Sequence, residues 1–296
     1  MKLKGQKKEG NQILRNLSIE GQIDVSQFSY ELNNMGSLLM NSGKSAMARS
    51  IFAEASKLHI FLSSYQRPVV TNVQREIEAL PIWNVEENVG LTAYDEELTE
   101  LTSFLPTLKQ EALEAAKSVE NPEFSRHWRV DTYVNVSTGN FIHSGSSGNL
   151  STLSIFHFGK KRRGACKDLM PSTCAFFKKS FKRAATFKVG LVKLTVLDAG
   201  AKTLPVTGLT NLKLRILVPV QIPSGFKFAI GKDEEVDFSD EKWDVIDNSF
   251  EHSFDNEKGT EKAIWLSIDI PHPEFSAEEE SKVSIHDFAK SYFLPF

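Results

Sequence analysis

Apolar side chains follow two different spacings along this chain. Between Gln27 and Leu62 they recur every three or four residues, with few Gly or Pro residues among them, which predicts amphipathic helix. Asn41-Ser42-Gly43 interrupts that spacing and predicts a turn. From about Ala184 onward apolar and polar residues alternate, which predicts strands. We therefore expect a helical hairpin near the start of the chain and a β-rich domain in its second half.

The predicted hairpin fits the packing pattern of a tetratricopeptide repeat, a helical unit of about 34 residues. A plain helical hairpin is the alternative. Residues 1–67 contain only one convincing unit, and a single unit cannot bury its apolar face alone. We expect it to pack on residues 1–26 or on the next domain. The small and large packing positions are occupied by Met35, Gly36, Leu39, Gly43, Ala48, Phe52 and Ala55.

Residues 68–124 connect these two parts and contain a helix of their own. Thr107-x-x-Gln110 matches a capping box, so we expect a helix from there through Val119, ending at Asn121-Pro122. Residues 137–152 are rich in Ser, Gly and Asn, which predicts a long loop. A phosphate-binding loop is not supported there, because no Gly-Lys-Ser/Thr follows.

Three segments show strand alternation, namely 212–218, 226–230 and 264–270. Turn residues such as Pro223-Ser-Gly225 favour a sandwich or barrel over a parallel α/β sheet. Arg215 lies in a strand whose two faces are both largely apolar. A charge in that setting needs a partner, so we interpret Arg215 as a site candidate in preference to a surface arginine.

The charge pattern argues against two classes of partner. A net charge of -3 predicts no general attraction to nucleic acid or membranes, and no apolar run reaches the roughly 18 residues of a membrane helix. The basic start, MKLKGQKKEGNQ, is followed by no apolar region and does not match a signal peptide, so we expect a soluble chain. Residues 160–193 are basic and 233–257 acidic. We interpret both as solvated faces, and the aromatics of the basic stretch as core instead of a nucleic-acid platform.

Three stretches in fixed order carry a family resemblance. The first is Leu153-Ser-Ile-Phe-x-Phe-Gly159, followed by Ala165-Cys166 and Pro171-Ser-Thr-Cys174. The second is Leu204-Pro-Val-Thr-Gly208-Leu-Thr-Asn211-x-x-Leu-Arg215. The third is Asp247-Asn-Ser-Phe-Glu-His252, followed by Asp269-Ile-Pro-His272-Pro273. Together they resemble the aspartyl/asparaginyl β-hydroxylase family, over a region from near Ile82 to Glu279.

The resemblance implies a fold and a chemistry. The family fold is a double-stranded β-helix, or jelly roll, and animal members carry helical repeats ahead of it. It implies an α+β protein with a helical, tetratricopeptide-like segment over residues 1–67 and the hydroxylase-like domain over 68–296. It also implies a dioxygenase in which two imidazoles hold Fe(II) and 2-oxoglutarate chelates the metal. Basic and hydroxyl groups hold the remote carboxylate of 2-oxoglutarate, and the substrate is Asp or Asn in a protein.

Matching the family motifs position by position assigns roles to four residues. His252 matches the second iron ligand, while the first falls on Val206, which has no donor atom. Arg215 matches a strand arginine that engages a carboxylate. Thr195 matches a hydroxyl position near the co-substrate. The metal site expected from the resemblance is therefore incomplete.

Three further positions of the family pocket are aliphatic in this chain. Leu217 stands where the family has a histidine and Leu150 where it has a tryptophan. Ala263 replaces the arginine that anchors the remote carboxylate, with Lys262 beside it as a candidate substitute. Losses at separated positions are hard to explain by a slip in the alignment.

The two cysteines, Cys166 and Cys174, leave two interpretations open. Taken alone, two thiols without CxxC spacing favour the reduced state over a disulfide scaffold. The resemblance instead matches them to a pair that closes a short loop in animal members. Such a bond implies a secretory lumen, and the resemblance points to the endoplasmic reticulum.

Two hypotheses for the function follow. The first is a degenerate oxygenase domain that acts as a binding or interaction module, has a protein partner and needs no cofactor. The second is an active dioxygenase that uses Fe(II) and 2-oxoglutarate on a protein substrate, with His252 and another ligand. Asp198 and Asp247 are the nearest candidate carboxylates.

Overall fold

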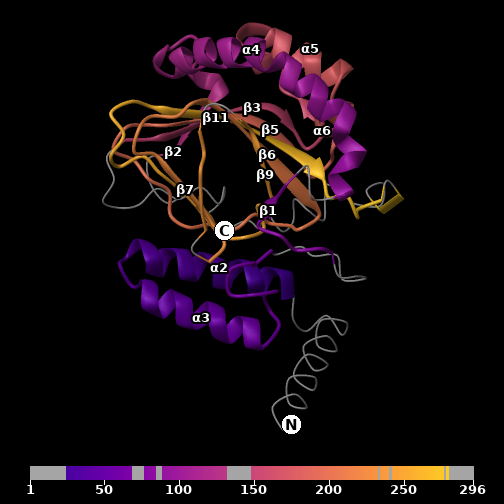
Figure 1. Cartoon of the computed structure of the whole chain (residues 1–296). Coiled ribbons are helices and arrows are strands. Elements are labelled where there is room, and N and C mark those ends of the chain that lie inside the picture. The colour runs from indigo at the N-terminus through magenta and orange to yellow at the C-terminus, as the bar shows by residue number, and fades with distance from the viewer. Residues whose placement is uncertain are drawn as a thin grey trace.

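The computed structural model describes residues 25–68, 77–84, 89–131, 148–232, 234–239, 242–276 and 278–279. It contains a helical hairpin, a helical layer and a two-sheet barrel between them (Figure 1). Residues 1–24 lie outside the described part, so the packing of the hairpin on residues 1–26 stays a prediction. No helix in the described ranges combines the length and apolarity needed to cross a membrane.

The predicted hairpin forms α2 (Val25–Asn41) and α3 (Ser45–Lys57), joined at Gly43 with a positive φ of 74°. The ring of Phe52 lies so close to Gly36 that any side chain at Gly36 would collide with it. The absence of a side chain at position 36 therefore makes room for the ring at position 52. The tetratricopeptide assignment itself stays a prediction.

The hairpin packs against the lower edge of the barrel in Figure 1. Its core residues Phe52 and Phe61 share one apolar cluster with Leu204 and Val206. Beside that cluster, the buried carboxylate of Glu251 pairs with Arg49 of α3 and with Arg67. The prediction that the hairpin packs on the next domain is therefore confirmed. The boundary predicted at 67/68 falls inside this junction.

The second helical layer covers the outer face of the larger sheet (Figure 1). Its main helix starts at Asp95, twelve residues before the predicted start at Thr107, so that prediction was wrong. Three acidic residues in the first turn favour the earlier start, and the helix continues through Pro106. The predicted end near Val119 is confirmed. The layer comprises η1 (Val89–Tyr94), α4 (Asp95–Lys117), η2 (Ser118–Glu120), η3 (Ser125–His127), η4 (Ala165–Leu169), α5 (Pro171–Lys179) and α6 (Lys182–Thr186).

Two antiparallel sheets form the barrel, in the order β1-β9-β6-β11-β5-β3-β2 with β4 beside β3, and β10-β7-β8. Their inner faces share an apolar cluster in which Leu217 and Trp265 of the larger sheet pack with Phe228 of the smaller one. The fold is thus α+β, with N-terminal helices and a double-stranded β-helix, as expected. The strands are β1 (Ile82–Trp83), β2 (Trp128–Asp131), β3 (Leu150–His157), β4 (Lys160–Lys161), β5 (Leu191–Leu197), β6 (Lys213–Gln221), β7 (Lys227–Ile230), β8 (Glu234–Val236), β9 (Asp244–Ile246), β10 (His252–Asp255) and β11 (Ala263–Pro271).

Two other expectations need correction. Cys166 and Cys174 are bonded to each other, so the reduced state favoured by the cysteines alone is wrong. Their separation of eight residues lets η4 fold back on α5, a geometry that two isolated cysteines in a sequence do not reveal. The end of the predicted loop is also wrong, because β3 already begins at Leu150. Residues 137–147 of that loop lie outside the described residues.

Candidate functional site

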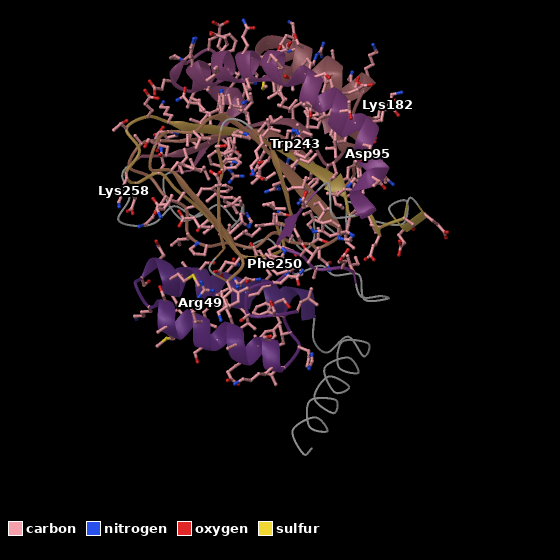
Figure 2. The ribbon with its side chains drawn as sticks, in the orientation of Figure 1. Arg49, Asp95, Lys182, Trp243, Phe250 and Lys258 are labelled. Carbon is pink, nitrogen blue, oxygen red and sulfur yellow. A yellow bond between two sulfur atoms is a disulfide. The ribbon has the colours of Figure 1, made fainter. Side chains whose placement is uncertain are left out.

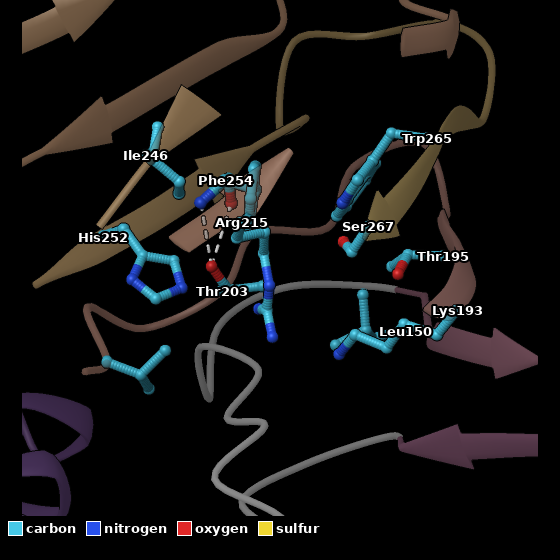
Figure 3. Close-up of a pocket in the computed structure, with 11 residues that line it drawn as sticks. Leu150, Lys193, Thr195, Thr203, Arg215, Ile246, His252, Phe254, Trp265 and Ser267 are labelled. Atoms are coloured by element: carbon cyan, nitrogen blue, oxygen red, sulfur yellow. Dashed lines mark hydrogen bonds between the residues drawn. The ribbon is translucent and has the colours of Figure 1, made fainter. Parts of the chain in front are cut away.

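A small pocket of about 50 Å³ opens between the two sheets. Figure 3 shows its two sides, with His252 and Thr203 facing Thr195 and Ser267 across Arg215. The pocket joins all four residues that the sequence singles out, namely Thr195, Val206, Arg215 and His252. The described residues that line it are Leu150, Lys193, Thr195, Thr203, Val206, Arg215, Ile246, His252, Phe254, Trp265 and Ser267.

Val206 and His252 lie directly opposite each other. They form an antiparallel bridge in which the amide of Val206 donates to the carbonyl of His252 at 3.0 Å, and the reverse bond measures 2.8 Å. Side chains at directly opposed positions of an antiparallel pair are about 4.5–5.5 Å apart at Cβ. A donor at position 206 would therefore stand beside the imidazole of His252, but the chain places an isopropyl group there.

The imidazole of His252 is held in one tautomer. Its Nδ1 lies 2.9 Å from the carbonyl oxygen of Phe250, and because a carbonyl only accepts, Nδ1 carries the proton and Nε2 the lone pair. Burial lowers the pKa of His252 to about 4, so the ring is neutral at pH 7. Figure 3 shows the ring pointing towards Arg215, and this orientation leaves Nε2 as a hydrogen-bond acceptor or metal ligand.

Arg215 has a carboxylate partner within the protein. Its Nε donates to Oδ1 of Asp269 at 2.7 Å, and an Nη2 donates to Oδ2 at 3.1 Å. Lys213 also pairs with Asp269, which is fully buried. Burial favours the neutral acid, but the two neighbouring cations outweigh it and hold the pKa of Asp269 well below its usual range. The predicted need of Arg215 for a partner is therefore confirmed, and Asp269 is that partner.

Thr195 occupies the centre of the larger sheet's inner face. It lies opposite Trp265 on β11 and opposite Thr152 on β3. Its hydroxyl oxygen is buried and has no hydrogen-bond partner among the described residues. A buried hydroxyl without a partner costs about 1–3 kcal/mol, so this oxygen is available to a ligand that enters the pocket.

The family model described as aspartyl/asparaginyl beta-hydroxylase matches residues 105–273, more than half of the chain. The chain belongs to this family. Two curated relatives named aspartyl/asparaginyl beta-hydroxylase are similar over 133 residues: the mouse (Mus musculus) protein at 29% identity and the human (Homo sapiens) protein at 27%. Each match covers 45% of this chain and 17% of the relative.

Among solved structures, a cupin 2 conserved barrel domain protein from Rhodopseudomonas palustris aligns with a TM-score of 0.28 and 10% identity. The alignment covers 48% of this chain and 71% of that chain. A score this low defines no common fold. The assignment of the double-stranded β-helix rests on the two facing sheets of this chain.

The three aliphatic residues that we matched to pocket positions of the family lie together in the barrel interior. Leu150, Leu217 and Ala263 are all buried and belong to the same apolar cluster as Trp265 and Phe254. Lys262, the candidate substitute for the missing arginine, instead pairs with Glu120 and Asp198 away from the pocket. It does not line the pocket, so the structure does not support that substitution.

The carboxylates proposed as replacement ligands do not reach the pocket. Asp198 accepts hydrogen bonds from Asn149 and lies near Lys262. Asp247 accepts from the amide of Ser249 and from Gln66, and burial raises the pKa of Asp247 to about 7. Neither residue lines the pocket.

A His-x-Glu pair, His272-Pro-Glu274, follows β11, but it does not line the pocket. His272 packs edge-on against Trp83 and accepts a hydrogen bond from the amide of Glu274. In the described part of the chain, no group of three His, Cys or acidic residues is placed to hold a metal. Among the described lining residues, His252 is the sole imidazole, and there is no carboxylate or thiol. These residues do not fit the Fe(II) site that the family implies.

Lys193, Thr203 and Ser267 belong to the pocket and were missed from the sequence. Lys193 alternates with Val192 and Leu194, so period-two spacing could have placed it on the same face as Thr195. Ser267 alternates in the same way within β11, where it lies opposite Lys193. For Thr203, in the irregular segment before Val206, the sequence carries no comparable signal.

Proposed function

We propose that this protein is a hydroxylase-family domain that has lost iron-dependent oxygenation and acts as a binding or interaction module. The observation that carries the proposal is the backbone pairing of Val206 with His252. Because that pairing fixes which side chain stands beside the imidazole, no local shift of the strand brings another donor to the position. Fe(II) would then depend on one imidazole and on solvent, instead of the two imidazoles that the family resemblance implies.

The interior also supports loss of the co-substrate. The remote carboxylate of 2-oxoglutarate would meet Leu217 and Ala263, which lie within an apolar cluster. A buried carboxylate without a charged partner is strongly disfavoured. The chain therefore lacks groups for binding both the metal and the remote carboxylate of 2-oxoglutarate. Both sets of groups would belong to the same pocket.

An active dioxygenase is the second candidate, and one observation favours it. The Nδ1 proton of His252 is held by a backbone carbonyl, which is how metal-binding imidazoles are commonly oriented. Arg215 also keeps its place in the same pocket. Under this alternative a ligand from elsewhere would complete the site, and Asp or Asn in a protein would be the substrate.

Anaerobic titration with Fe(II), or with Mn(II) as a stand-in, separates the two candidates. We expect the full chain to bind metal weakly, with no strengthening by 2-oxoglutarate and no release of succinate in air. Val206→His should raise the affinity for Mn(II), while Val206→Leu, which adds no donor, should not. Micromolar binding that is coupled to 2-oxoglutarate, followed by succinate release, would show that the second candidate is right.

The bonded pair Cys166 and Cys174 supports a location in an oxidising compartment such as the endoplasmic reticulum lumen. Alkylation of the protein taken directly from cells should then label neither cysteine until a reductant is added. Labelling of both without reductant would argue for a reducing compartment.

A further inference from the structure

The lining of the pocket is polar at one side and apolar at the other, and the change runs along the strands of the larger sheet. Lys193, Thr195 and Ser267 lie on adjacent strands of the larger sheet, and Ser267 is directly opposite Lys193. Towards the apolar side, Trp265 lies directly opposite Thr195, and Leu150 follows on β3 of the same sheet. Phe254 of the smaller sheet packs on Trp265, with ring centroids 4.5 Å apart. Figure 3 shows Arg215, Ser267 and Thr195 around one opening, with Trp265 above it. A ligand suited to this pocket has one polar end and one short apolar end.

The polar side favours an anion. Lys193 and Arg215 both line the pocket, and no acidic side chain lines it among the described residues. Within the described structure, Arg215 and Lys213 both pair with Asp269, which lies outside the pocket lining. Hydrogen bonds from cations and hydroxyls to a carboxylate are among the stronger ones in proteins.

The hydroxyl of Thr195 is a second and independent observation. Thr195 is 3% exposed, and its Oγ1 is buried without a hydrogen-bond partner in the described structure. Since Thr195 lines the pocket, a ligand oxygen there would satisfy the hydroxyl. A carboxylate accepts from a hydroxyl and from ammonium groups at once.

We infer that this pocket binds a small aliphatic monocarboxylate without a metal ion, with the carboxylate at Lys193, Thr195 and Arg215. The short apolar chain of the ligand packs against Leu150 and Trp265. The inference rests on the proposed function, because an intact iron site would place 2-oxoglutarate in the same space.

The interior explains why the ligand carries one carboxylate and not two. Beyond the polar side, a second carboxylate would meet Ala263 and Leu217, both buried in the apolar cluster. Lys262 cannot reach it, because Lys262 is paired with Glu120 and Asp198. The pocket volume of about 50 Å³ also lies well below the roughly 300–1,000 Å³ of drug-sized sites, and this favours ligands of a few carbon atoms.

Calorimetric titration of the full chain in excess EDTA tests the inference with propionate and isobutyrate as probes. We expect both to bind and to raise the unfolding temperature, while succinate and 2-oxoglutarate bind at least about tenfold more weakly, the effect of one poorly accommodated charge. An aspartate peptide blocked at both ends separates the sources of the carboxylate. Binding of the free acids alone indicates a metabolite, and binding of the peptide as well indicates the side chain of a partner protein.

Thr195→Val is the decisive variant, because it keeps the shape and removes the hydroxyl. It should weaken propionate binding about tenfold or more, the usual effect of losing a hydrogen bond to a charged group, without lowering the stability of the free protein. Thr173→Val is the matched control, since Thr173 also has a buried hydroxyl without a described partner but lies on α5, outside the pocket. It should leave binding unchanged. Lys193→Met, which should also weaken binding, provides a second variant at the polar side.

The possible failures are distinguishable. If no monocarboxylate binds in EDTA and 2-oxoglutarate does not bind with Mn(II) either, the inference is wrong while the proposed function stands. If 2-oxoglutarate binds only together with metal and succinate is released, both are wrong. Equal losses of binding in Thr195→Val and Thr173→Val would show a general effect on stability and would overturn the assignment of the site.

Discussion

The two faces of the eight-stranded sheet differ in the chemistry of their side chains. On the outer face, Leu194, Leu266 and Ile268 belong to one apolar cluster that the helical layer covers. On the inner face, the same strands carry polar and charged side chains. Thr195 and Ser267 line the pocket, and Asp269 is the centre of a buried ion cluster. A uniform face tolerates exchange among hydrophobic residues, whereas on the mixed face each residue has its own partner. Chemistry can therefore be lost from the inner face while the fold persists.

The largest effect should come from the ion cluster of the inner face. Asp269→Asn leaves Lys213 and Arg215 buried without their shared carboxylate, and breaking a buried ion pair costs about 3–5 kcal/mol. Urea unfolding should show this loss in the free energy of unfolding. Glu235→Gln, whose pair with Lys227 is exposed on both sides, is the control and should change stability by less than about 0.5 kcal/mol. Equal stability of Asp269→Asn and the parent chain would contradict the assigned network.

Substitutions at two adjacent residues of β5 allow a direct comparison of how much each face contributes to stability. Leu194→Ala on the outer face should cost about 2–5 kcal/mol, because it leaves a cavity under the helical layer. Thr195→Val on the inner face should be neutral or slightly stabilising, since it removes a buried hydroxyl that has no described partner. Thermal unfolding of both variants measures the contrast. Similar losses in the two would mean that the inner face is as tightly constrained by packing as the outer one.

The pH dependence of stability should identify another buried acid, Asp247, which directly follows β9. Burial raises the pKa of Asp247 to about 7, well above the usual range of an aspartate, so the folded state binds its proton more tightly than the unfolded state. The stabilisation is complete below about pH 4 and is lost as the pH rises through about 7, by up to about 4 kcal/mol. Asp247→Asn should lack this loss, because an amide side chain does not titrate between pH 4 and 8. Parallel curves for the two proteins from pH 4 to 8 would refute the assignment.

The smallest effect should come from Lys262, beside the aliphatic end of the inner face. Its ammonium group pairs with Glu120 and Asp198 at the surface, and exposed pairs contribute at most about 1 kcal/mol. Lys262→Met should therefore change neither the metal affinity nor the affinity for propionate. A clear loss of either would show that Lys262 does serve the pocket in place of the missing arginine.

Sequence patterns predicted the outer face better than the inner one. Alternation in residues 264–270 places Ile264, Leu266, Ile268 and Ile270 on one face, and the structure confirms it, because alternation alone decides which face is buried. The partner of Arg215 depends on the register between β6 and β11, and that register shifts at a bulge between Ile264 and Trp265. No local pattern encodes such a shift. Val206 and His252 are 46 residues apart in the chain. Only the family motif, which matches both to metal-ligand positions, indicated that they lie close together.

The junction between the hairpin and the barrel also sets an order for folding during synthesis. Arg49 and its partner Glu251 are separated by 202 residues, so at roughly 5–20 residues per second the partner emerges about 10–40 s after the hairpin. During that interval Phe52 lacks Leu204 and Val206 as neighbours, and the apolar face of the hairpin stays open to other proteins. We expect the hairpin to need a chaperone until strand β10 has left the ribosome.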